Sequence, residues 1–247
     1  MTIGALVAVT AGAWLWLLRM QSDVGPFRRM PGMTMPGMSM TTMSATDAVM
    51  LFVMWTVMMA AMMLPSAAPM ILLVASVNRR RRAQARPAAP TAAFVAGYLI
   101  VWTGFSAAAA AAQWALHQRA LLTPAMTTRS PLLGGLILVV AGLYQWLPFK
   151  TACLGHCRSP LHFIGSHWRE GTAGSILMGL SHGLYCLGCC WALMLLLFVA
   201  GVMNLAWVAA IAALVLVEKV TRLGPRVGQV IGLALVGYGA WLLAMAA

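Results

Sequence analysis

Residues 48–77 read AVMLFVMWTVMMAAMMLPSAAPMILLVASV and contain no Asp, Glu, Lys or Arg. An α-helix needs about 20 apolar residues to cross the roughly 30 Å hydrocarbon core of a bilayer, so this stretch exceeds one crossing. The helix that it predicts must therefore either tilt or extend beyond the bilayer. Pro65 and Pro69 lie inside it and are expected to kink this helix or end it early.

The composition of the whole chain agrees with a membrane protein. Hydrophobic residues make up 62% of the 247 residues, charged residues make up 8%, and the mean hydropathy is +0.87. A soluble domain of this size needs a far more charged surface. The period-two alternation of a membrane β-barrel is absent. The sequence predicts an all-α, polytopic transmembrane helical bundle that forms a single membrane domain over 1–247.

Seven apolar segments predict about seven membrane spans, or six if the first segment is a signal peptide that is cleaved. The first segment lacks a basic n-region and a clear small-residue cleavage site, which favours an uncleaved helix. The predicted spans are 3–18, 48–77, 91–116, 131–149, 172–199, 202–217 and 227–246.

The basic residues predict the orientation of these spans, because Lys and Arg accumulate in cytoplasmic loops. With the N-terminus in the cytoplasm, the inner loops 79–86, 150–171 and 218–226 hold eleven of the 16 Lys and Arg residues, and the outer loops hold five. We therefore expect a protein of the bacterial inner membrane with a cytoplasmic N-terminus and an outer C-terminus. The formal charge of +12 then reflects orientation signals and lipid contact, and no nucleic-acid partner is expected.

The expected extracytoplasmic loop, 20–46, is rich in methionine. Pro-Gly pairs interrupt it and prevent a regular helix or strand. The methionine thioether is soft and uncharged, and it selects Cu(I) over harder ions. We predict metal capture here; the alternative is an interfacial loop that places its methionines in lipid. The candidate ligands are Met33, Met35, Met38 and Met40.

Two predicted spans carry soft donors at helical spacing. Donors recur every four residues from position 50 to 62 and from position 178 to 194, so each series lies along one helix face. A histidine inside a membrane is rare unless it has a partner or a task. A metal or redox site is the functional interpretation of these faces, and packing is the alternative. The candidate ligands are Met58, Met59, Met62, Met63, His182, Cys186, Cys189, Cys190 and Met194.

A third group of donors lies in the expected cytoplasmic Cys/His loop, 150–171. Cys153 and Cys157 are four residues apart and can face one ion from a single helical turn. No matching second half of a zinc-finger motif accompanies them, so zinc is less well supported than copper. The cytosol is reducing, so a permanent disulfide between them is not expected.

Three segments, in this order along the chain, resemble a bacterial family of predicted metal-binding integral membrane proteins, a domain of unknown function. They are 55–66 (WTVMMAAMMLPS), 144–160 (YQWLPFKTACLGHCRSP) and 179–194 (GLSHGLYCLGCCWALM). The resemblance extends over about the second to the sixth predicted span. It implies a membrane location and a metal site.

These patterns favour membrane binding of copper as Cu(I), with translocation or delivery from the methionine loop through the two helix faces to the inner cysteine pair. A copper chaperone or a membrane cuproenzyme is the expected protein partner. One alternative is a membrane thiol-disulfide oxidoreductase that uses Cys186 and Cys189 or Cys153 and Cys157. Another is an assembly or accessory subunit of a copper membrane enzyme. The sequence contains no Walker A motif and no Asp-Lys-Thr-Gly loop, and we expect a metal-handling protein rather than an enzyme.

Overall fold

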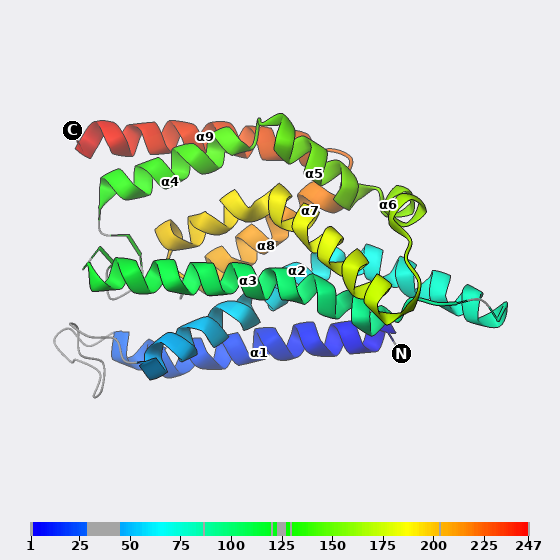
Figure 1. Ribbon diagram of the computed structural model, residues 1–247. Coiled ribbons are helices and arrows are strands. Elements are labelled where there is room, and N and C mark those ends of the chain that lie inside the picture. The colour runs from blue at the N-terminus through cyan, green and yellow to red at the C-terminus, as the bar shows by residue number, and fades with distance from the viewer. Residues whose placement is uncertain are drawn as a thin grey trace.

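The computed structural model describes residues 2–28, 45–85, 87–119, 121–122, 127–128, 130–202 and 204–246. These residues form an all-α structure, which confirms the predicted fold class (Figure 1). The helices are α1 (Thr2–Arg28), α2 (Ala45–Ala83), α3 (Thr91–Gln118), α4 (Pro131–Tyr144), α5 (Pro148–Arg158), α6 (Pro160–His167), α7 (Gly171–Ala200), α8 (Leu205–Val220) and α9 (Gly224–Ala246).

Among the described residues, five helices are long and apolar enough to cross a membrane, namely α1, α2, α3, α7 and α9. The pair α4 and α5 is bent by 63° and adds a sixth span if it crosses as one broken helix. The segment expected as the sixth span, 202–217, forms α8, whose 16 residues are fewer than the about 20 that a crossing requires. The chain is thus a polytopic membrane protein with five or six candidate spans, where the sequence predicted about seven. Much of the expected loop 150–171 is helical and forms α5 and α6.

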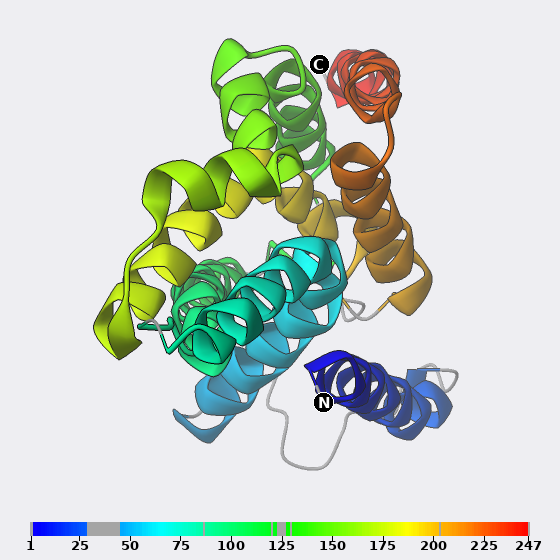
Figure 2. The ribbon, with the colours of Figure 1, turned by 90° about the vertical axis from the view of Figure 1, so that its right-hand side faces the viewer.

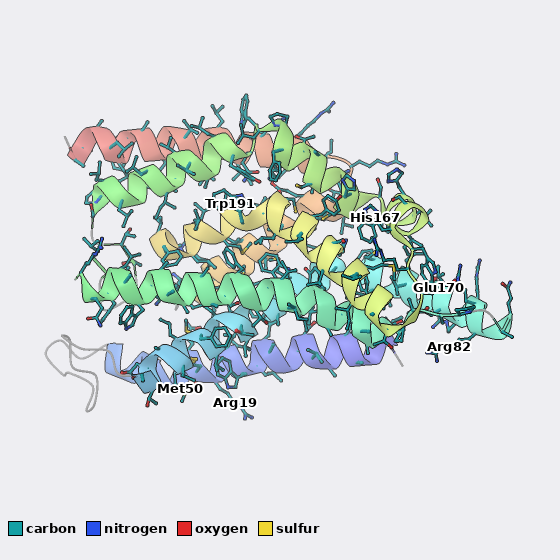
Figure 3. The ribbon with its side chains drawn as sticks, in the orientation of Figure 1. Arg19, Met50, Arg82, His167, Glu170 and Trp191 are labelled. Carbon is teal, nitrogen blue, oxygen red and sulfur yellow. The ribbon has the colours of Figure 1, made fainter. Side chains whose placement is uncertain are left out.

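The long helices run side by side, and the two chain ends lie at opposite ends of the bundle (Figure 1). Arg82, His167 and Glu170 lie together at the end of the bundle that holds the N-terminus (Figure 3). Seen from that end, α1 and α9 lie at opposite edges (Figure 2). Burial follows this arrangement: within an apolar stretch of 18 residues in each helix, 61% of the residues of α2 and 56% of those of α7 are buried, against 6% for α1 and 17% for α9. The core therefore lies between α2 and α7.

The helix α2 continues through Pro65 and Pro69 and does not end at either proline. A proline has no backbone N–H, so the carbonyl four residues earlier loses its helical partner. For Pro65 this carbonyl belongs to Ala61, and Nε1 of Trp14 in α1 donates to it at 3.3 Å. The neighbouring helix thus satisfies the group that the proline frees, which is how membrane helices tolerate proline.

Glycines bring two pairs of helices into direct backbone contact. Between α3 and α7, a Cβ atom on Gly179 would overlap the carbonyl of Phe94. Between α4 and α9, a Cβ atom on Gly142 would lie 2.6 Å from the carbonyl oxygen of Gly232. Small residues at such positions let membrane helices approach closely. The close approach of α3 brings its side chains within reach of the cysteines of α7.

We predict that Gly179→Ala destabilises the protein by roughly 1–3 kcal/mol, because the added methyl group must displace the backbone of α3. Thermal unfolding in detergent measures this change. Gly104→Ala is the matched control, since Gly104 lies on α3 and a Cβ atom there would meet no other atom within 4 Å. The control should be neutral or slightly stabilising. Equal unfolding temperatures for the two variants would contradict the close packing of α3 against α7.

Candidate metal centre

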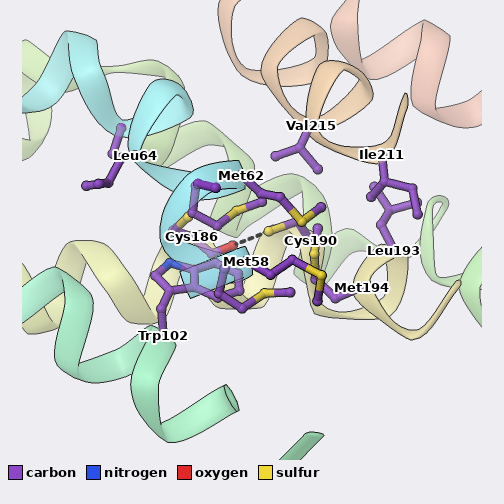
Figure 4. Packing of buried hydrophobic residues seen from close by; sticks show 14 of the residues in the cluster. Met58, Met62, Leu64, Trp102, Cys186, Cys190, Leu193, Met194, Ile211 and Val215 are labelled. Atoms are coloured by element: carbon purple, nitrogen blue, oxygen red, sulfur yellow. Dashed lines mark hydrogen bonds between the residues drawn. The ribbon is translucent and has the colours of Figure 1, made fainter. Parts of the chain in front are cut away.

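Three cysteines of α7 lie in the interior of the bundle. Cys186 is fully buried, and Cys189 and Cys190 are each 1% exposed. The thiols of Cys189 and Cys190 donate to the backbone carbonyl of Cys186 at 3.1 and 3.0 Å; Figure 4 shows the bond from Cys190. Because both bonds end on the backbone carbonyl of Cys186, the sulfur atom of Cys186 remains available for contacts with other helices.

Side chains from two other helices contact the Cys186 sulfur. The ammonium Nζ of Lys219 in α8 lies 2.9 Å from it, and the hydroxyl of Tyr98 in α3 lies 3.1 Å from it. Lys219 also donates to Oγ of Ser66 in α2 at 3.0 Å. The Tyr98 hydroxyl lies 3.2 Å from the carbonyl oxygen of Met63, to which it can donate. One buried sulfur therefore connects α7 with α2, α3 and α8.

The two cysteines of α5 lie next to the cysteines of α7. The side chain of Cys157 packs against the part of the core that contains Cys186 and Cys189. Cys153 packs against α7 at Gly188, where a Cβ atom would lie 2.8 Å from the Cys153 sulfur. Gly188 thus leaves room for this thiol. The cysteine pair that the sequence places in an inner loop meets the cysteines of α7 in the structure.

Methionine thioethers from two helices complete the group. The methionines of α2 that the sequence selects as ligands are each at most 1% exposed, and Met194 is fully buried. Figure 4 shows Met58, Met62, Cys190 and Met194 grouped together in the core. We use the name sulfur centre for this group of side chains: Met58, Met62, Cys157, Cys186, Cys189, Cys190 and Met194.

His182 lies one helical turn before Cys186 and is enclosed by aromatic rings. Its ring centroid is 5.9 Å from that of Phe94, 5.8 Å from that of Tyr98 and 5.4 Å from that of Phe163. The side chain is 3% exposed, and its Nδ1 atom has no hydrogen-bond partner among the described residues. Burial of an unpaired polar atom is unfavourable. His182 therefore presents a nitrogen atom that a ligand could satisfy.

Glu218 and Lys219 lie in the interior, whereas the sequence placed both in the inner loop 218–226. They are only 1% and 8% exposed. The Nζ atom of Lys150 lies 2.8 Å from both carboxylate oxygens of Glu218, and Arg158 donates to the backbone carbonyl of Glu218 at 2.9 Å. The apolar run that leads up to Glu218 could have indicated that both charged residues belong to the helix, because α8 extends to Val220 instead of ending at position 217.

The donor chemistry of the sulfur centre fits copper. Thiolate and thioether sulfurs are soft ligands that select Cu(I) over hard cations. Among the described residues, no three or more His, Cys, Asp or Glu side chains form a group that could hold a metal ion. The thioethers are additional donors next to the thiols. Met33, Met35, Met38 and Met40 lie outside the described residues.

A family model described as PpoB2, copper chaperone, matches residues 52–242. The chain belongs to this copper chaperone family. The match runs from α2 into α9 and includes every residue of the sulfur centre, whereas α1 lies outside it. Family membership establishes copper handling, which the soft donors predicted. No curated protein and no solved structure matches the chain.

We predict that mild oxidation of the detergent-solubilised protein joins Cys157 to Cys186 or Cys189, because these side chains are neighbours in the core. Peptide mass spectrometry after alkylation identifies the bond between α5 and α7. Cys157→Ser should abolish this crosslink, and Cys153→Ser should leave it in place. If α7 crosslinks to Cys153 and never to Cys157, the described placement of Cys157 is incorrect.

Proposed function

We propose that this copper chaperone binds Cu(I) at the sulfur centre and passes it through the membrane domain to an acceptor protein. The observation that carries this proposal is the gathering of cysteine side chains from α5 and α7 around the buried Cys186, with the thiols of Cys189 and Cys190 on its backbone carbonyl. Copper is the cargo of the protein, and the proposed thiolate ligands come from Cys157, Cys186, Cys189 and Cys190, no more than two of which hold one ion in the described arrangement. Met58, Met62 and Met194 add thioethers, and His182 offers an imidazole nitrogen one turn away.

Lys219 has a hydrogen-bond partner whether or not copper is bound at Cys186. A charged group inside a membrane protein needs a partner of opposite charge, and a Cys186 thiolate supplies one at 2.9 Å. The thiolate is also the form of cysteine that binds metal. Ser66 offers a second acceptor at 3.0 Å, so the ammonium keeps a hydrogen bond when a copper ion takes its place at Cys186.

The bundle suggests a direction for the transfer. The N-terminus and the arginine-bearing end of α2 lie at one end (Figure 1), and the excess of basic residues there favours the cytoplasmic side. The methionine-rich segment 30–43 precedes α2, and it is proposed to capture copper at the other side. Cys157 is half-buried and is the proposed exit ligand. Thiolates carry a charge that thioethers lack, so affinity for Cu(I) should rise from the methionines to the cysteines.

The close thiols of Cys157 and Cys186 also favour a second candidate function, thiol-disulfide exchange. An oxidoreductase would exchange electrons between this pair and a partner, without bound copper. Metal analysis after anaerobic purification separates the two functions. Copper close to stoichiometric supports the first, and a disulfide that titrates reversibly without bound metal supports the second.

We predict that Cys186→Ala lowers the affinity for Cu(I) by roughly 10–100-fold or more, since even groups outside the first ligand shell have effects of this size. Competition with a colorimetric Cu(I) chelator under anaerobic conditions measures the affinity. Met245→Leu at the end of α9, where the side chain is 71% exposed, is the control and should bind copper normally. Unchanged affinity in a folded Cys186→Ala protein would rule out the sulfur centre.

We predict that Lys219→Met relaxes the preference of the site for monovalent ions. Two unit charges about 4 Å apart interact by about 4 kcal/mol at an effective dielectric constant of about 20, and a divalent ion meets about twice this repulsion from the ammonium. The affinity for Co(II) relative to Ag(I) should therefore rise by roughly 100-fold or more. Lys219→Arg keeps the charge and should keep the preference. If the affinity for Co(II) relative to Ag(I) is the same in Lys219→Met and in the unmodified protein, this role of Lys219 is excluded.

A further inference from the structure

A hollow lies between α1, α2 and the beginning of α8. Met20 near the end of α1 and Met54 and Met58 near the beginning of α2 contribute to its wall. These parts of α1 and α2 lie toward the end of the bundle opposite the N-terminus (Figure 1). The full lining is Leu17, Met20, Gln21, Met54, Met58, Val202 and Leu205. Three thioethers thus face one small space whose other walls are mainly apolar.

The hollow adjoins the sulfur centre, because the side chain of Met58 belongs to both. Met58 lines the hollow and is also grouped with Met62 and Cys190 in the core (Figure 4). Met54, Met58 and Met62 are four residues apart on α2, which corresponds to steps of roughly 6 Å along the helix. Successive thioethers therefore lead from the hollow toward the buried thiols of α7.

The outer wall of the hollow is the least embedded helix of the bundle. Within an apolar stretch of 18 residues, only 6% of the residues of α1 are buried, against 61% for α2. Leu17 is 5% exposed, and Trp14 donates to the Ala61 carbonyl, so α1 packs on α2 along one face and leaves its other face outside the core. The hollow is thus placed where an ion could enter between α1 and α2.

We propose that the hollow is an entry site for a soft monovalent cation, in which Met20, Met54 and Met58 hold Cu(I) before it moves to the sulfur centre. This inference rests on the proposed function. Thioethers are soft, uncharged ligands, so they bind Cu(I) without a counter-charge and release it to the negatively charged thiolates. The transfer exchanges one sulfur ligand for another, and the copper remains Cu(I) throughout. Met20 lies on α1, outside the segment that the family model matches.

The test compares the rate of ion loading with the amount of ion bound. The double variant Met20→Leu/Met54→Leu keeps the apolar volume and removes two sulfur atoms. Full-length protein in lipid nanodiscs is mixed with Ag(I), and the ultraviolet absorption of the metal-bound thiolates is followed by stopped flow. We expect loading to slow by roughly tenfold or more, equivalent to about 1.4 kcal/mol, with the same amount of Ag(I) bound at equilibrium. Met50→Leu, on the same helix and 65% exposed, should load at the normal rate.

Methyl-¹³C methionine NMR of the unmodified protein is a second measurement that does not depend on the variant folding. Addition of Ag(I) beyond the amount that the thiols bind should shift the signals of Met20 and Met54 and leave that of the exposed Met245 in place. Normal loading in the double variant, or unshifted Met20 and Met54 signals, would overturn the entry site. Failure of the unmodified protein to bind Ag(I) at its thiols would instead contradict the proposed function.

Discussion

Lys219 is held inside an apolar helical bundle with its ammonium 2.9 Å from the Cys186 sulfur and 3.0 Å from the Ser66 hydroxyl. A charge in this position is costly unless its partners are fixed around it. The contacts of Lys219 therefore constrain α2, α7 and α8 relative to one another. The Tyr98 hydroxyl brings α3 to the same sulfur, and the glycine contacts between α3 and α7 make that approach close enough. These contacts hold α2, α3, α7 and α8 together beside the sulfur centre.

A buried ion pair next to Lys219 links this arrangement to the proposed exit. Glu218 precedes Lys219 on α8 and pairs with Lys150 at the beginning of α5. Arg158, at the end of α5, donates to the backbone carbonyl of Glu218. Both ends of α5 are thus held against α8, and Cys157 is presented to Cys186 between them. The contacts of Lys150 and Arg158 with Glu218 thus hold α5 in place, and they also position the half-buried Cys157 near the fully buried Cys186.

The sequence predicted the membrane character, the all-α class and the copper chemistry, because each follows from composition and from donors spaced four residues apart. It did not reveal that the cysteines of α5 and α7 lie together, since that contact depends on the 63° bend between α4 and α5. Nor did it reveal Glu218 and Lys219 as interior residues, because charges at the end of an apolar run resemble a loop boundary. The continuity of α2 through Pro65 depends on Trp14 of another helix, which no local pattern in α2 contains.

X-ray absorption spectroscopy at the copper edge, on anaerobically loaded protein, tests most directly whether sulfur from cysteines and methionines holds copper in the interior of the bundle. We expect Cu(I) with a ligand shell dominated by sulfur, and a clear change in that shell in Cys186→Ala. Copper bound mainly by nitrogen or oxygen ligands, with a shell that Cys186→Ala leaves unchanged, would contradict binding by sulfur.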